Sequence, residues 1–138
     1  MEEPIENMEE VIRRDGRYPP EAFGFLHDGL NYAVEHVHGD APPEPHPDDP
    51  DAPHGRHVTG QELCWALRDL ALERWGMLAR TVLRRWNLRR TIDFGNMVYL
   101  MIEHGFMRKT EEDSIEDFRD VFDFDEALQF QDEFELKE

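Results

Sequence analysis

Arginine is concentrated in one short stretch of the chain, RTVLRRWNLRRT at residues 80–91. Guanidinium groups bind carboxylate and phosphate oxygens through paired hydrogen bonds, so such a stretch can bind an anion. Arg80 and Arg84, and Arg85 and Arg89, are spaced to line one side of a helical turn. The candidate contact residues here are therefore Arg80, Arg84, Arg85, Arg89 and Arg90.

The charge around this stretch suggests what the anion is. The chain carries a formal net charge of -17, and residues 60–109 carry +4 between flanks of -10 and -11. A field of the overall sign repels nucleic acid at long range. We therefore expect the arginines to pair with the protein's own acidic ends, and contact with an RNA backbone or a ribosome is the alternative.

The acidic stretch near the carboxyl end also carries aromatic residues. Between residues 114 and 138 phenylalanines alternate with carboxylates, and their spacing predicts two short amphipathic helices. Because phenylalanine is costly to leave in water, we expect residues 114–128 to dock on the domain and residues 132–138 to fray as an acidic tail. The candidate contact residues of this stretch are Phe118, Phe122, Phe124, Phe130 and Phe134.

Metal binding has weaker support. The chain has seven histidines, including an HxH pair (His36, His38) and an HxxH pair (His54, His57). Zinc requires three or four ligands held close together, whereas HxH on a helix points its rings about 200° apart. We expect no metal centre; these four histidines are weak candidates for a metal-dependent activity.

Residues for covalent catalysis are scarce. Ser114 is the one serine and stands among acids, and the one cysteine, Cys64, falls in the first turns of a predicted helix. A helix N-terminus can lower a thiol pKa, but a buried apolar role is the simpler interpretation. No phosphate-binding glycine loop occurs. The sequence therefore predicts a protein that is not an enzyme and needs no cofactor.

Five helices precede the acidic aromatic stretch. We expect the first from Pro4 to Gly16, with Ile5, Met8 and Ile12 on one face, and the second between Pro19/Pro20 and Gly39. A capping box, Thr59 to Glu62, starts the third, and Gly76 breaks it. The fourth presents Met77, Leu78, Val82, Leu83 and Trp86 and closes at Asn87. The fifth spans 92–104, is capped by Thr91 or Asp93, ends at Gly105 and is apolar nearly all round, which places it in the core.

These elements predict the fold class. We expect an all-α single domain, 1–138, of about five or six helices, with the Pro/His/Asp-rich residues 40–58 as an exposed mobile loop. The alternative is a winged-helix-like core with a short strand near residues 106–108. Residues 77–104 have the outline of a helix-turn-helix, but an apolar second helix cannot contact base edges, so we expect no sequence-specific DNA binding.

Four segments together carry a resemblance: HVTGQEL, RWGMLARTVLRRWN, TIDFGNMVYLMIEHGFM and DFRDVFDFDEAL. In this combination the chain resembles a small family of uncharacterised bacterial hypothetical proteins known mainly from planctomycete and verrucomicrobial genomes, over about residues 18–128. Asn87 stands where the family pattern has glycine, and both residues close a helix. The resemblance implies one structured domain that includes the acidic aromatic stretch, and it implies no activity.

The expected function follows from what is absent. The longest apolar run, 97–102, is too short to cross a bilayer, the N-terminal residues do not form a signal peptide, and one cysteine forms no internal disulfide. We therefore expect a cytoplasmic protein that does not bind membranes. The sequence predicts a small acidic interaction protein, an adaptor or accessory subunit with a protein partner.

Overall fold

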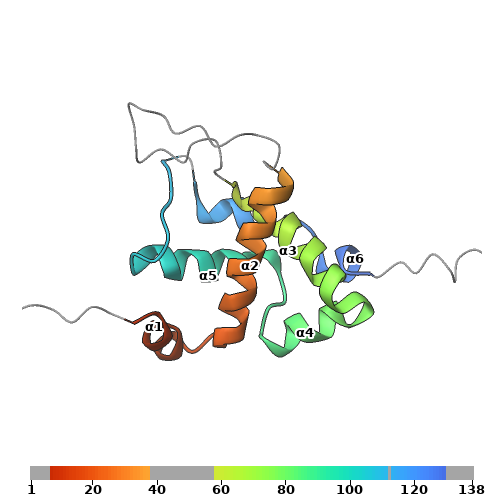
Figure 1. The fold of residues 1–138 in the computed structure, drawn as a ribbon, viewed down its shortest axis with the longest axis horizontal. Helices are drawn as coiled ribbons and strands as arrows, with labels where there is room; N and C mark the ends of the chain where they lie inside the picture. Colours follow the sequence, from red (N-terminus) through yellow and green to blue (C-terminus); the bar gives the residue numbers. More distant parts are fainter. Residues whose placement is uncertain (1–6, 38–57, 112, 130–138) are drawn as a thin grey trace, which may run out of the picture.

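The computed structural model describes residues 7–37, 58–111 and 113–129 (Figure 1). All regular structure in these ranges is helical, so the predicted all-α class is confirmed. Residues 106–108 form no strand, and the winged-helix alternative is therefore wrong. The helices are α1 (Met8–Asp15), α2 (Pro20–Val37), α3 (Gly60–Trp75), α4 (Ala79–Arg85), α5 (Thr91–Glu103) and α6 (Phe124–Ala127), with 3-10 helices η1 (Gly76–Leu78) and η2 (Ile115–Phe118).

Two predicted segments fall mostly or wholly outside the described ranges. Of the loop at 40–58 only Val58 is described, and the tail at 132–138 is not described at all. Among the helices that are described, none has both the length and the apolar character needed to span a bilayer.

The first helix begins later than its apolar pattern predicts. Asn7 is the N-cap, and its side chain accepts a hydrogen bond from the Glu9 N–H at 2.8 Å. Pro4 lies outside the described residues. The predicted stop is confirmed, because Gly16 adopts a left-handed φ of 77° that glycine takes without strain.

Helices α2 and α3 form the main helix pair. The predicted capping box of α3 is confirmed: the Glu62 N–H donates to Thr59 Oγ1 at 3.1 Å, and the Thr59 N–H donates to Glu62 Oε1 at 3.0 Å. A Cβ on Gly29 of α2 would overlap the Leu67 side chain, so the absence of a side chain lets the two helices approach closely. The predicted apolar stripe of α3 is buried, with Leu63, Ala66, Leu67, Leu70 and Ala71 all in the core.

Helix α5 lies in the core, as predicted, and runs across α2 (Figure 1). Its buried residues include Phe94, Met97 and Met101. A Cβ on Gly95 would stand 2.8 Å from Phe118 Cβ, so this glycine admits the aromatic ring of η2. The helix is followed by Gly105 at φ 81°, which confirms the predicted stop.

Helix α4 is shorter than predicted. Gly76, at φ 55°, ends helix α3 as expected. Residues 76–78 then form η1, and α4 starts only at Ala79. Met77 and Leu78 were predicted on the core face and are instead 72% and 60% exposed. The tighter 3-10 turn places both outside the α-helical register that would have turned them inward.

The acidic aromatic stretch docks on the domain as predicted for residues 114–128. Its buried side chains are Phe118, Phe124, Ala127 and Leu128. The Phe124 and Phe94 ring centroids are 5.6 Å apart, and Arg68 Nε of α3 donates to the Ala127 carbonyl at 2.8 Å. Burial of these apolar side chains and one part-buried hydrogen bond therefore hold α6 against α3 and α5.

Candidate interaction surface

The five arginines of residues 80–90 lie on α4 and on the turn that joins it to α5. We call this set, Arg80, Arg84, Arg85, Arg89 and Arg90, the arginine surface. Arg80 pairs with Asp125 of α6 at 2.7 Å. The expectation that these arginines bind the protein's own acidic end is thus confirmed for Arg80, although a pair this exposed contributes only about 0.2–1 kcal/mol.

Arg84 and Arg85 are exposed on α4. Among the described residues neither has a carboxylate within salt-bridge distance. Met77 and Leu78, the two most exposed large apolar side chains described, lie in η1 directly before this helix. The segment 77–85 therefore carries both exposed apolar area and two arginines without a carboxylate partner among the described residues.

Arg89 and Arg90 line a cleft of about 410 Å³ beside the acidic stretch. Asp120, Asp123 and Asp125 line the same cleft, so side chains of opposite charge share it.

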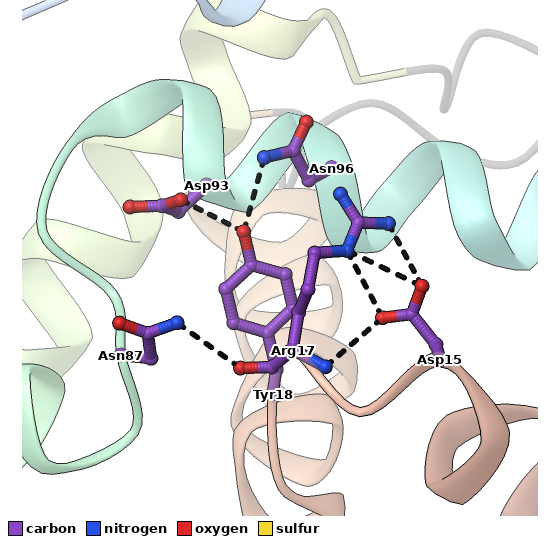
Figure 2. A network of polar contacts seen from close by, with 6 residues as sticks. All are labelled: Asp15, Arg17, Tyr18, Asn87, Asp93 and Asn96. Carbon is purple, nitrogen blue, oxygen red and sulfur yellow. Dashed lines mark hydrogen bonds and ion pairs between the residues drawn. The ribbon is translucent and has the colours of Figure 1, made fainter.

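Asp93 joins the turn that carries Arg89 and Arg90 to Tyr18, and Figure 2 shows its bond to the Tyr18 hydroxyl. Its Oδ2 accepts from the backbone N–H groups of Arg89 at 2.8 Å and Arg90 at 3.0 Å. Its Oδ1 accepts from the Tyr18 hydroxyl at 2.7 Å. The N-cap of α5 is Arg90, so the prediction of Thr91 or Asp93 at this position is wrong. Asp93 instead lies in the first turn and accepts from the N–H of the N-cap, and the Thr91 hydroxyl donates to the Phe118 carbonyl.

Tyr18 is buried and connects the first loop to α5. Its hydroxyl also accepts a hydrogen bond from Asn96 Nδ2 at 3.0 Å. Burial raises the pKa of Tyr18 to about 12; the hydrogen bond to Asp93 acts in the same direction, and the one from Asn96 opposes it. The phenol therefore keeps its proton and donates to the Asp93 carboxylate at neutral pH.

Asn87 provides a second attachment of the same turn (Figure 2). It takes the predicted left-handed position at φ 66°, and its Nδ2 donates to the Arg17 carbonyl at 3.2 Å. The Arg17 guanidinium binds Asp15 through Nε and Nη2 at 3.0–3.2 Å, and this hydrogen bonding raises the pKa of Arg17. Hydrogen bonds to Asp93 and from Asn87 therefore hold the turn that carries Arg89 and Arg90, which we call the arginine turn.

The predicted aromatic contact residues are only partly available. Phe118 and Phe124 are 5% and 7% exposed, so their assignment to a contact surface is wrong: both rings belong to the core. Phe122 is half-buried against Trp65, with ring centroids 4.5 Å apart. Phe130 and Phe134 lie outside the described residues.

The histidine candidates gain no support from the described residues. Nδ1 of His36 lies 2.9 Å from the Tyr32 carbonyl, and its ring stacks on that of Tyr32. His38, His54 and His57 lie outside the described residues, and within those residues no group of three or more His, Cys, Asp or Glu side chains could hold a metal ion.

Cys64 has the environment of a core residue. Its side chain is fully buried, and burial raises the pKa of the thiol to about 12. A thiol that stays protonated and out of contact with water is a poor nucleophile.

Two features of this region have no strong sequence signal. The Tyr18–Asp93 hydrogen bond joins residues 75 positions apart, and no local pattern predicts it. The exposure of Met77 and Leu78 depends on where η1 ends.

No protein-family model, curated protein or solved structure matches the chain.

Proposed function

We propose that the protein is a small cytoplasmic interaction protein, an adaptor or accessory subunit that is not an enzyme. It binds an acidic segment of a partner protein through the arginine surface. One observation carries this proposal: the short segment 77–85 holds the two most exposed large apolar side chains of the described residues, Met77 and Leu78, together with Arg84 and Arg85, which have no carboxylate partner in the described part of the chain.

The spacing of these four residues supports a shared contact surface. Met77 and Leu78 lie in η1 directly before α4, and Arg84 and Arg85 lie in the last turn of α4. Helix α4 has 7 residues and rises by about 10 Å, so one partner segment can contact both pairs. Methionine and arginine are both enriched in protein–protein interfaces, where apolar contact and charge pairing act together.

The chemistry of the partner follows from the surface. An acidic segment with apolar side chains would pair its carboxylates with Arg84 and Arg85 and cover Met77 and Leu78. The chain already provides an example of this pairing, because Arg80 binds Asp125 in a segment that also carries Phe122 and Phe124. A preorganised turn at Arg89 and Arg90 lowers the entropy that binding must offset.

RNA is the second candidate partner, and the clustered guanidinium groups favour it. The local charge opposes it. Asp120, Asp123 and Asp125 line the cleft beside Arg89 and Arg90 and would repel a phosphate backbone there. The same carboxylates would repel an acidic protein segment, so the preference for a protein rests on the exposed Met77 and Leu78, whose apolar surface a phosphate backbone does not use.

The test is a pull-down from native lysate, with and without nuclease, using the full chain and two double variants. Arg84→Glu/Arg85→Glu removes the charge, and Met77→Ser/Leu78→Ser removes the apolar contact. We expect one stoichiometric protein that survives nuclease and binds each variant at least tenfold more weakly, a loss of about 1.4 kcal/mol. Arg13→Glu is the matched control, because Arg13 is exposed on α1 and pairs only loosely with Glu9 at 3.5 Å.

Two outcomes would contradict the proposal. If ribosomal proteins are captured and disappear with nuclease, the arginine surface binds RNA. In that case Met77→Ser/Leu78→Ser would leave binding nearly unchanged, while affinity would fall steeply with salt. If the captured protein binds both double variants as well as it binds the Arg13→Glu control, another surface makes the contact.

A further inference from the structure

Gly24 differs from the other glycines of the described α-helices because no neighbouring element packs against it. Gly29, Gly60 and Gly95 each face a neighbour that a Cβ would strike, so close packing explains them. Gly24 lies in the first half of α2, is exposed, and has no atom within 4 Å of the place where a Cβ would stand. Glycine is less stable than alanine at such a position. The packing of the fold therefore gives no reason for glycine here.

The open space beside Gly24 belongs to an apolar groove of about 710 Å³. Its walls come from α1, from the first half of α2, and from α5 with the turn that follows it. Of the apolar side chains on these walls, Met8 is 42% exposed and Phe106 is half-buried, whereas Ile12, Phe23, Leu26 and Met101 are buried beneath them. Methionine side chains adapt to different apolar partners, and Met107 adds a third to this groove.

The charged side chains at this groove are acidic. Among the described residues that line it, Glu9 and Asp28 are acidic and none is lysine or arginine. Glu9 pairs with Arg13 at 3.5 Å and Asp28 with Arg74 at 2.9 Å. Helix α2 carries no lysine or arginine, so its unpaired negative charge rests on Glu21 and Glu35, which flank the groove along the helix.

We propose that this groove binds an amphipathic helix of a partner protein, with large apolar side chains on one face and lysine or arginine beside them. The missing side chain at Gly24 lets the backbone of that helix approach α2 closely, as Gly29 does for α3 inside the fold. The basic flanks of the helix meet the carboxylates of α2. A second copy of this chain is a poor occupant, since two molecules of formal net charge -17 repel each other.

The groove is separate from the arginine surface. The arginine turn precedes Thr91 and the groove includes the turn after Glu103, so the two lie at opposite ends of α5, roughly 18 Å apart by helix rise. The inference therefore does not rest on the proposed function, and the arginine variants do not enter its test.

The experiment uses a synthetic probe and the full chain labelled with ¹⁵N. The probe is a leucine–lysine peptide of about 18 residues, five helical turns, with leucines on one helical face. A scrambled peptide of the same composition, without an apolar face, controls for nonspecific charge attraction. We expect the amphipathic peptide to shift the amide signals of Met8, Gly24 and Met107, and the scrambled peptide to leave them unchanged.

Two variants locate the binding site. Gly24→Leu fills the groove at an exposed helical position that has room for it, so the fold is retained, and we expect binding at least tenfold weaker. Thr81→Leu adds the same side chain to the exposed face of α4 and is expected to bind the probe like the parent chain. Equal binding by Gly24→Leu, or equal shifts from both peptides, would overturn the proposal. A concentration-dependent dimer that Gly24→Leu dissociates would also overturn it, because the groove would then hold a second copy.

Discussion

Replacement of Asp93 by alanine provides the sharpest test of how the arginine turn is held. The carboxylate accepts hydrogen bonds from two backbone N–H groups, of Arg89 and Arg90, and from the buried Tyr18 hydroxyl. Loss of a cap costs about 1 kcal/mol. A buried hydroxyl donor left without its acceptor costs about 1–3 kcal/mol more. We therefore expect Asp93→Ala to lower the free energy of unfolding by about 3 kcal/mol.

The assay is equilibrium unfolding in urea, with stability derived from the midpoint at an unchanged m-value. Glu73→Ala is the control, because Glu73 is exposed on α3, and its change should stay within about 0.5 kcal/mol. Asp93→Asn keeps the shape but offers one acceptor oxygen instead of two. It can serve either the backbone amides or Tyr18, so its loss should be about half that of alanine.

A double-mutant cycle with Tyr18→Phe separates the two functions of Asp93. If the phenol–carboxylate bond is formed, the double variant should be less destabilised than the sum of the single variants by about 1–2 kcal/mol. Hydrogen exchange at the Arg89 and Arg90 amides should accelerate in Asp93→Ala and not in Tyr18→Phe. Strict additivity, or an Asp93→Ala variant as stable as the Glu73→Ala control, would refute the network as described.

Two further predictions use other residues. Gly24→Ala should stabilise the protein by about 0.5–1 kcal/mol, whereas Gly95→Ala should destabilise it by about 1–2 kcal/mol, since its methyl group would press on the buried Phe118 ring 2.8 Å away; equal urea midpoints for the two would contradict the packing of η2. The second concerns alkaline pH: an unfolded tyrosine ionises near pH 10, but Tyr18 keeps its proton to about pH 12 in the fold. The unfolded state therefore binds fewer protons between these values, and stability falls as pH rises, by about 1.4 kcal/mol per pH unit for this group. Tyr18→Phe should lose that part of the slope, and an unchanged slope would show that Tyr18 does not carry it.

The sequence predicted helix ends well where a local motif determines them. The Thr59–Glu62 capping box, the left-handed Asn87 and the stop at Gly105 each depend on a few neighbouring residues. Such motifs act through hydrogen bonds and backbone geometry within one or two turns, so they can be identified without knowledge of the fold. The start of α1 was wrong because Asn7 caps the helix, while the apolar pattern extends back to Ile5.

Errors occurred where a pattern was continued past a break. The helical period of α4 was extended back to Met77, although Gly76 changes the local geometry to a 3-10 turn. For the same reason the sequence did not predict that Met77 and Leu78 are the most exposed large apolar side chains of the described residues. Phe118 and Phe124 show a related error: composition suggested a contact surface, and burial in the core is the stronger effect for a phenyl ring.

Contacts between distant segments could not be predicted from one sequence. Tyr18 and Asp93 bear no periodic relation to each other, and neither does Asn87 to Arg17. These contacts nevertheless determine the candidate site, because they fix the turn from which Arg89 and Arg90 project. The residue types of the site can thus be read from the sequence, whereas the hydrogen bonds that hold its turn in place are seen only in the structure.

The two proposed surfaces together account for the distribution of charge. The arginine surface lies at the amino end of α5, and the groove, flanked by the acidic helix α2, lies at the other end. Because the two surfaces carry opposite charge, one kind of partner segment cannot bind well to both. On these two proposals, an acidic partner and a basic partner would each have its own surface on one small domain. The basic stretch in an acidic chain would then serve to distinguish the acidic partner from the basic one.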